Sequence, residues 1–356
     1  MSVYITGTFL SVLFAYIATH IGYTKQLRSM EINMLKRLFI FMSFLPLTAI
    51  MAFRYDVGTD FKSYESIFLH GAIKRMEKGY VAFNEFLKIF THNPQIVFIV
   101  SAIIICAGYF FLFYKESINP AYSILLFVIS KDYFMSLNGM RQYIATAIIL
   151  FAVPSMRKKK WKSVLIALLI AFLFHRTSII FLLLYILYHF EISPVIAAST
   201  AIATLLASST LLHFMERILR YWGYYNAYFV NRSDYYNMQG INYTAALVYV
   251  SFFILLSYKY SAVKTSDSLK LMYSAVTVEL LLIGLSPVMP TNFHWVMAEL
   301  NSIIAAYTPQ LIKSVQNRFI KYAANTVIIV AYSAMTIVAI TNGNQDVLPY
   351  QSIWSR

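Results

Sequence analysis

Three short groups of polar residues interrupt an otherwise apolar chain, and each contains side chains that can do chemistry. The first group comprises Arg54, Gly58, Asp60 and Tyr64 in the pattern Arg-x-x-x-Gly-x-Asp-x-x-x-Tyr. A guanidinium binds pyrophosphate or carboxylate through paired hydrogen bonds, glycine permits a tight turn, and a carboxylate can act as a base. The group therefore predicts either an anion-binding site or a structural Arg–Asp pair that anchors a helix end.

The second group, Asn138, Arg141 and Gln142, lies at the junction of two apolar segments. Asn138 is a suitable N-cap for a helix that begins at Gly139, which places Arg141 in the first turn of that helix. A cation there opposes the helix dipole and is costly at membrane depth, so it should have an anionic partner. That partner is either a bound anion or a carboxylate such as Asp132.

The third group is His175, Arg176 and Thr177 at the end of another apolar segment. A histidine can donate, accept or carry a proton near neutral pH, although a histidine at a helix end is often only a satisfied polar group. Two further acids, Glu279 and Glu299, fall inside apolar segments. Ionisable residues at such depth are functional candidates, but each acid can equally neutralise a structural arginine.

The elements that must position these groups follow from composition. The 356 residues are 59% hydrophobic and 12% charged, whereas a soluble domain has about 25% charged residues. We therefore predict an all-α polytopic membrane protein, residues 1–356 forming a single membrane domain. Apolar segments near bilayer length predict about twelve spans. They are Val3–Ile21, Leu38–Phe53, Pro94–Tyr114, Ala121–Leu137, Gly139–Pro154, Val164–Phe174, Ser178–Phe190, Val195–Leu212, Thr244–Tyr258, Leu271–Met289, Trp295–Ile312 and Ala323–Thr341.

The distribution of basic residues predicts the orientation. The net charge of +14 comes largely from lysines and arginines in alternate short loops, which indicates cytoplasmic loops rather than nucleic-acid binding. Those loops include residues 25–37, 115, 157–162, 259–270 and 313–321. Both termini and all three polar groups then face outward.

Two long outward loops, residues 54–93 and 213–243, follow from this topology. In the first, Tyr64–Ile73 and Val81–Phe90 mix apolar and charged residues at helical spacing, which favours interfacial or re-entrant helices. The second is rich in aromatic residues, which suit an interfacial belt but also stack on sugars. The sequence has no closely spaced His or Cys ligand set, no Walker loop and no Rossmann fingerprint, so we expect no metal and no nucleotide cofactor.

Taken in order, the three motifs resemble those of the EpsG family. These are membrane proteins of bacterial exopolysaccharide, capsule and O-antigen clusters, taken as Wzy-type polymerases with a GT-C-like fold. The resemblance runs from about Phe53 to Tyr185, and the closing Pro349-Tyr350-x-x-Ile353-Trp354 is also family-like. Where family members commonly carry an arginine in a late span, this chain has His294, which can substitute for it.

The resemblance implies a multi-pass protein of the bacterial inner membrane that polymerises undecaprenyl-pyrophosphate-linked oligosaccharides on the outer face. The growing glycan is transferred from its lipid pyrophosphate to the nonreducing end of the next lipid-linked unit. The implied partners are the lipid-linked repeat units, the bilayer, a flippase and a chain-length regulator. The expected catalytic residues are His175, Asp60 and Arg141, and the expected substrate-binding residues are Arg54, Tyr64, Asn138, Gln142, Arg176 and His294.

Two other activities also need cations near a lipid headgroup. One is a transporter or flippase of lipid-linked oligosaccharides, which should carry polar residues through the membrane depth or show inverted repeats with broken helices. The other is a different lipid-linked glycan ligase or acyltransferase acting at the same face. The polar groups gather on one side of the predicted membrane, which favours the polymerase.

Overall fold

The computed structural model describes residues 1–21, 29–71, 76–190, 266–285 and 294–355, with isolated positions between 199 and 207. These residues are helical, and the β-pairing among them is a single antiparallel bridge between Arg54 and Ser352. The prediction of an all-helical chain is therefore confirmed. The structure divides into two compact units. The first comprises Met1–Ile179, Ala305–Lys313 and Lys321–Arg356, and the second Ile180–Ile304 and Ser314–Ile320.

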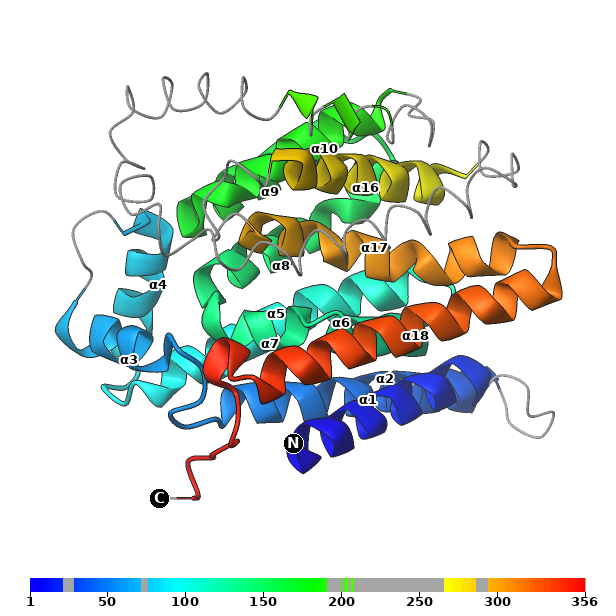
Figure 1. Cartoon of the computed structure of the whole chain (residues 1–356). Coiled ribbons are helices and arrows are strands. Elements are labelled where there is room, and N and C mark those ends of the chain that lie inside the picture. The colour runs from blue at the N-terminus through cyan, green and yellow to red at the C-terminus, as the bar shows by residue number, and fades with distance from the viewer. Residues whose placement is uncertain are drawn as a thin grey trace. The chain divides into compact units, whose positions relative to one another are not determined.

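The first unit is a bundle of long helices with two short helices at one end (Figure 1). Helix α5 packs against both α2 and α8, and α8 also packs against α9. About 61% of the α5 span is buried inside the protein, compared with 28% of α1, so α5 forms the centre of the bundle. The helices are α1 (Ser2–His20), α2 (Ser29–Ala52), α3 (Phe61–His70), α4 (Lys78–Lys88), α5 (Gln95–Glu116), α6 (Pro120–Ile129), α7 (Asp132–Asn138), α8 (Met140–Arg157), α9 (Trp161–Phe174), η2 (Arg176–Ile179), α18 (Arg318–Thr341) and η6 (Asn344–Asp346).

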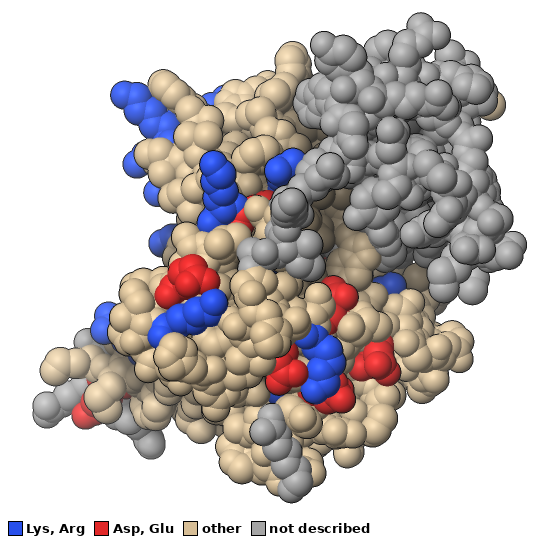
Figure 2. Space-filling model, turned by 90° about the vertical axis from the view of Figure 1, so that its left-hand side faces the viewer, with Lys and Arg blue, Asp and Glu red and all other residues tan. Residues whose placement is uncertain are grey.

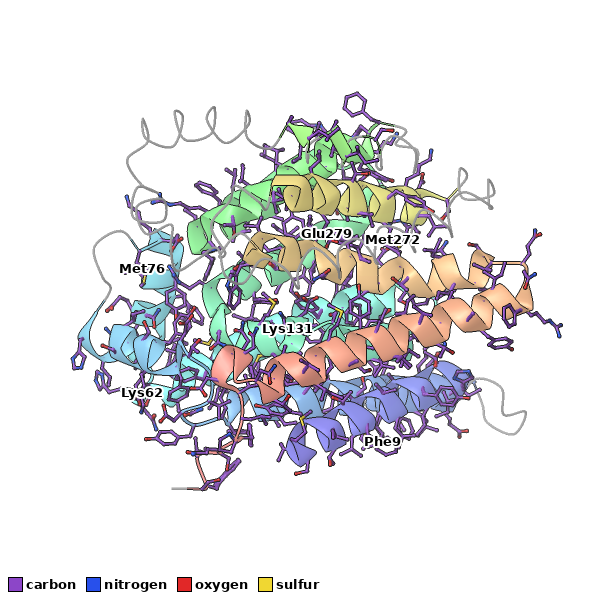
Figure 3. All side chains as sticks on the ribbon, in the orientation of Figure 1. Phe9, Lys62, Met76, Lys131, Met272 and Glu279 are labelled. Carbon is purple, nitrogen blue, oxygen red and sulfur yellow. The ribbon has the colours of Figure 1, made fainter. Side chains whose placement is uncertain are left out.

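The outer helices expose apolar side chains, as a membrane protein requires. Phe9 on α1 is 62% exposed (Figure 3), and α9 and α18 present exposed leucine, isoleucine and valine side chains. Extensive exposed apolar surface of this kind marks contact with lipid. Among the described residues, four helices are long and apolar enough to cross a bilayer: Ser2–His20, Met30–Ala52, Gln95–Glu116 and Arg318–Thr341.

The predicted number of about twelve spans is not established by these helices. Three further apolar helices are shorter than a bilayer span: Pro120–Ile129, Trp161–Phe174 and Arg176–Tyr188. The predicted spans Val195–Leu212 and Thr244–Tyr258 lie almost wholly outside the described residues, as does the aromatic loop 213–243.

One predicted span is wrong in its extent. We expected Ala121–Leu137 to form one helix, but the structure breaks it between α6 and α7. The break is at Lys131 (Figure 3), whose φ of 76° is left-handed and cannot continue a right-handed helix. The apolar residues on both sides conceal this break in the sequence. Because of it, α7 ends at Asn138 immediately before α8 begins.

The predicted helices in loop 54–93 are confirmed, each displaced by about three residues toward the N-terminus. Helices α3 and α4 lie at the end of the bundle where α2 finishes (Figure 1). Helix α3 buries Phe61, Tyr64 and Phe68 beneath an exposed polar face, so it is amphipathic. This is the pattern expected of a helix that covers a bundle end.

In the second unit, α10 (Ile180–Tyr188) packs against α16 (Asp267–Leu285). Helix α17 (His294–Ser314) begins in this unit, and its residues from Ala305 to Lys313 belong to the first unit. Glu279 on α16 (Figure 3) and Glu299 on α17 are both buried.

Candidate active site

The first two polar groups meet at the end of the bundle that carries α3 and α4. The backbone N–H of Asp60 donates a hydrogen bond to Oδ1 of Asn138 at 3.2 Å. Gly58 has a φ of +98°, and a Cβ placed there would lie 2.5 Å from the same oxygen. Only glycine fits that position, because the backbone conformation and the close approach both exclude a side chain. The first two groups are therefore in direct contact.

Glu77 joins the second group to the third. The Arg141 Nη1 donates to Glu77 Oε2 at 2.5 Å, and His175 Nδ1 lies 3.4 Å from Glu77 Oε1. The second separation is long for a hydrogen bond, so we treat it as an electrostatic contact. All three polar groups therefore converge within the first unit.

Glu77 was not identified from the sequence as the anionic partner of Arg141. The suggestion that Asp132 neutralises Arg141 was wrong. The carboxylate that holds Arg141 is 64 positions away along the chain. Glu77 belongs to no motif and precedes α4 directly. The available signal was general, since an arginine at this depth requires an anionic partner and the outward loop 54–93 holds several acids, Glu77 among them.

A glycine allows Glu77 to reach this position. A Cβ on Gly79 would lie 2.6 Å from the backbone oxygen of Leu173, so α4 approaches the last turn of α9 at the limit set by the two backbones. Glu77 precedes Gly79 by two residues, and His175 follows Leu173 by two. The close helix contact therefore holds the carboxylate beside the imidazole.

Gly79→Val should separate α4 from α9 and disconnect Glu77 from His175. We expect the activity of the cluster to fall by roughly 10²-fold, because displacements of about 1 Å near reacting groups have effects of that size. The control is Ala82→Val, which places the same valine side chain on the exposed face of the same helix. Turnover per molecule of protein in the membrane would measure both variants. Equal turnover in the two variants would contradict this role of the helix contact.

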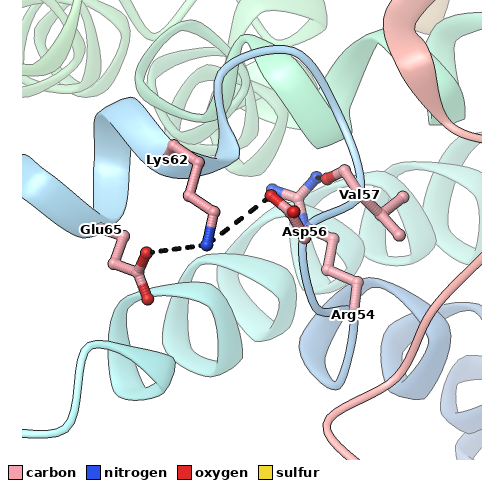
Figure 4. A network of polar contacts seen from close by, with 5 residues as sticks. All are labelled: Arg54, Asp56, Val57, Lys62 and Glu65. Atoms are coloured by element: carbon pink, nitrogen blue, oxygen red, sulfur yellow. Dashed lines mark hydrogen bonds and ion pairs between the residues drawn. The ribbon is translucent and has the colours of Figure 1, made fainter. Parts of the chain in front are cut away.

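Arg54 is enclosed by the protein. Its side chain is completely buried, its Nη1 donates to the Val57 carbonyl at 3.0 Å (Figure 4), and its guanidinium lies 5.2 Å from the Phe98 ring centroid. Within the described part of the chain, its Nε and Nη2 have no hydrogen-bond partner. Burial lowers the pKa of Arg54 to about 10, so the group remains charged at neutral pH and its aromatic neighbours stabilise that charge.

The proposed structural pair between Arg54 and Asp60 does not form. Arg54 is turned inward, whereas Asp60 is exposed at the start of α3. The surface ion pairs of this loop instead join Lys62 to Asp56 at 3.7 Å and to Glu65 at 3.3 Å (Figure 4). Exposed pairs of this kind contribute little to stability.

Exposure separates the site residues into two sets. Arg141 and His175 keep 29% and 21% of their side chains exposed, and Asp60 is exposed at the surface. By contrast, the predicted substrate-binding residues Arg54, Tyr64, Asn138 and Gln142 are each no more than 5% exposed. The accessible set is therefore the one expected to be catalytic. Figure 2 shows this end of the chain, where acidic and basic side chains lie close together on the surface.

Burial and neighbouring charges have opposite effects on the pKa of Glu77. Burial would raise the pKa of the carboxyl, but the adjacent His175 and Arg141 outweigh it and lower the pKa to about 2. Glu77 is therefore ionised at any pH near neutrality. Partial burial raises the pKa of Asp60, against the lowering influence of Arg141 and Arg54. A carboxyl whose pKa is raised is a better proton acceptor than an ordinary surface aspartate.

Asn138 does not cap α8, contrary to the prediction. The N-cap of α8 is Gly139, without a side-chain capping bond, and Asn138 uses its amide for longer-range contacts. Its Nδ2 donates to the Gln345 carbonyl at 2.9 Å and to Gln345 Oε1 at 2.6 Å. Gln345 belongs to η6 and was not expected at this site.

The remaining predicted residues are less closely tied to the cluster. Arg176 begins η2 and is exposed. His294 is the first residue of α17, and its side chain lies outside the described part of the structure. In the described part of the chain, no three His, Cys, Asp or Glu residues are grouped so that they could hold a metal ion.

These features define a helical membrane protein with a charged, partly accessible cluster at one end of its bundle. A model of the EpsG family matches residues 37–352, nearly the whole chain. The chain therefore belongs to the EpsG family, which is associated with polysaccharide polymerase-type glycosyltransferase activity. The match extends well beyond the stretch from Phe53 to Tyr185 that holds the three motifs. Searches of curated proteins and of solved structures gave no match.

Proposed function

We propose that the protein is a Wzy-type polysaccharide polymerase of the bacterial inner membrane. It transfers the growing glycan from undecaprenyl pyrophosphate to the nonreducing end of the next lipid-linked repeat unit, on the outer face. The observation that carries this proposal is the arrangement of Arg141, Glu77 and His175 beside the exposed Asp60. In this proposal, the arrangement supplies a fixed cation and a proton acceptor together at an accessible bundle end.

The reaction requires these two functions at once. An acceptor hydroxyl oxygen forms a bond to the anomeric carbon of the donor glycan while the bond from that carbon to the pyrophosphate oxygen breaks. The electron pair of the broken bond stays on the undecaprenyl pyrophosphate, and the hydroxyl proton moves to a base. A preplaced guanidinium stabilises the charge that develops on the leaving oxygens, and Arg141 is the accessible arginine held in place for this role.

His175 is the base in this proposal. Its Nδ1 faces Glu77, so a proton on Nδ1 is stabilised by the carboxylate and Nε2 is left as the acceptor. Such a pairing of a base with an orienting carboxylate is common in sites that activate hydroxyl groups. Asp60 is the second candidate, because its carboxyl, although exposed at the surface, loses part of its hydration to the surrounding protein, which raises its pKa.

The buried residues support these groups in the proposal. Arg54, Tyr64, Asn138 and Gln142 shape the bundle end rather than contact the sugar, since each is almost fully enclosed. Exposed Arg176 gives a second cation next to His175 for the lipid headgroup.

The opposite end of the first unit supports an outward-facing site. There Arg157 pairs with Glu116, and Tyr307 donates to the same carboxylate at 2.9 Å, so the C-terminal ends of α5 and α8 are joined to each other and to α17. The surrounding loops carry the lysines that indicate a cytoplasmic position. The site lies at the other ends of α5 and α8 and would then face outward, together with both termini. A flippase that supplies lipid-linked units and a chain-length regulator are the partners this arrangement would require.

Incubation of the purified protein with its undecaprenyl-pyrophosphate-linked repeat unit, without nucleotide or added metal, tests the proposal. A ladder of glycan lengths is expected. A single transfer without a ladder would indicate a ligase or acyltransferase. Movement of intact lipid across proteoliposomes without any transfer would indicate a transporter, and either result would overturn the polymerase assignment.

A further inference from the structure

We infer that the C-terminal segment Asn344–Trp354 is an integral part of this active site, with Gln345 as a positioning residue that acts through Asn138. The inference rests on the proposed function for its catalytic readout, but the contacts that support it do not. The segment follows the last helix, α18, and returns along the loop that carries Arg54.

The segment pairs with the backbone on both sides of Arg54. The N–H of Tyr55 donates to the Gln351 carbonyl at 2.9 Å, and the N–H of Ile353 donates to the Phe53 carbonyl at 3.0 Å. These bonds flank the antiparallel bridge between Arg54 and Ser352. A short two-stranded pairing therefore holds the backbone of Arg54 from outside the bundle.

The start of the segment holds the next part of the same loop. The N–H of Gly58 donates to the Asp346 carbonyl at 2.8 Å, and the N–H of Thr59 donates to the Gln345 carbonyl at 3.3 Å. Without the segment, these donors near the site would lose their partners, and unsatisfied buried backbone groups are strongly disfavoured.

Gln345 also holds Asn138, which in turn holds Asp60. The completely buried amide of Asn138 donates to Gln345 through Nδ2 and accepts the Asp60 N–H through Oδ1. Asn138 therefore connects the C-terminal segment to the start of α3, where Asp60 lies close enough to Arg141 for the guanidinium to lower its pKa. A shift of Gln345 should move Asp60 relative to Arg141.

Two tyrosines fasten the segment to the bundle. Tyr4 on α1 donates to the Val347 carbonyl at 3.0 Å, and Tyr350 donates to the Ile50 carbonyl on α2 at 3.1 Å. Val347 is completely buried, and the rings of Tyr4 and Tyr350 meet edge to face at 5.5 Å. These contacts fix the segment to helices that do not themselves carry site residues.

The first experiment tests the docked position without any activity assay. Phe53→Cys combined with Ile353→Cys should form an intramolecular disulfide on mild oxidation in membranes, because the two residues lie opposite each other next to the antiparallel bridge between Arg54 and Ser352. The native Cys106 is buried and should not compete. Each single variant is the control. Failure to cross-link would overturn the inference whatever the function of the protein, whereas a cross-link in a protein that forms no glycan would count against the proposed function only.

The second experiment tests positioning. Gln345 has a φ of 71°, so Gln345→Gly retains the backbone conformation and the carbonyl acceptor but removes Oε1, whereas Gln345→Val also strains the backbone. We expect kcat to fall by roughly tenfold in the glycine variant and by roughly 10²-fold in the valine variant. KM should change less than about twofold, because neither variant removes a group that binds substrate. Asn342→Val, at an exposed position just before the segment, is the control.

A double-mutant cycle separates positioning from general stability. If Gln345 acts through Asn138, adding Gln345→Gly to Asn138→Ala should cause little further loss of kcat. Independent, multiplicative losses, or normal kcat in the Gln345→Val protein, would overturn the assignment of Gln345. These point variants test the positioning role of Gln345 even if deletion of residues 344–356 prevents folding.

Discussion

Arg141→Ala should abolish long-chain glycan while the protein remains in the membrane. The guanidinium is the accessible cation of the cluster, and Glu77 holds it at 2.5 Å, so it is preorganised for the charge that develops on the departing pyrophosphate. Removing one preorganised donor of this kind costs about 10²–10³ in rate. Loss of the full cationic charge should bring chain extension below detection on a gel of cell-surface glycan.

Arg157→Ala is the matched control for that variant. Arg157 lies at the opposite end of the same helix, α8, and it too is paired with one glutamate, Glu116. Loss of Arg157 should reduce the stability of the protein and its amount in the membrane. It should not change the length of the glycan that each remaining protein molecule makes. If Arg141→Ala leaves chain length unchanged, or if both variants lose it equally, Arg141 has no special part in the chemistry.

His175→Ala should reduce turnover by roughly 10²-fold or more, the range typical of a general base. The effect should appear in kcat, because the imidazole accepts a proton in the transition state and does not contribute to binding of the substrate in its ground state. Glu77→Gln should lower kcat by roughly tenfold, since the amide retains the shape but not the charge that orients the imidazole. The measurement is steady-state turnover of the purified protein with its lipid-linked repeat.

His70→Ala controls for the loss of an imidazole at the same end of the unit. His70 is exposed at the end of α3 and should be replaceable without loss of turnover. Near-normal turnover in His175→Ala would transfer the role of base to Asp60, and Asp60→Asn would then be the variant that fails.

The convergence of the site could be predicted because it follows from helix ends. Each polar group adjoins an apolar segment, and alternation of basic loops places all three groups on one side. The sequence could not reveal which groups touch. Glu77 reaches Arg141 across 64 positions and Gln345 reaches Asn138 across 207, and neither contact leaves a periodic or local pattern.

The same reasoning explains the wrong assignments. Asn138 was interpreted as a helix cap because its residue type and position suit one, but the return of the C-terminal segment offers its amide a different set of partners. The break at Lys131 was missed because apolar residues continue on both sides. The sequence also could not show that the folded loop encloses Arg54 beside Phe98, and its predicted role in binding substrate stays a prediction.

Binding of undecaprenyl pyrophosphate to the purified protein tests the central claim most directly. The wild-type protein and Arg157→Ala should bind this lipid at least about tenfold more tightly than undecaprenol, because a charge-assisted contact to phosphate is worth a difference of that order. Arg141→Ala should lose the preference and bind both lipids alike. An undiminished preference for the pyrophosphate in Arg141→Ala would contradict the account.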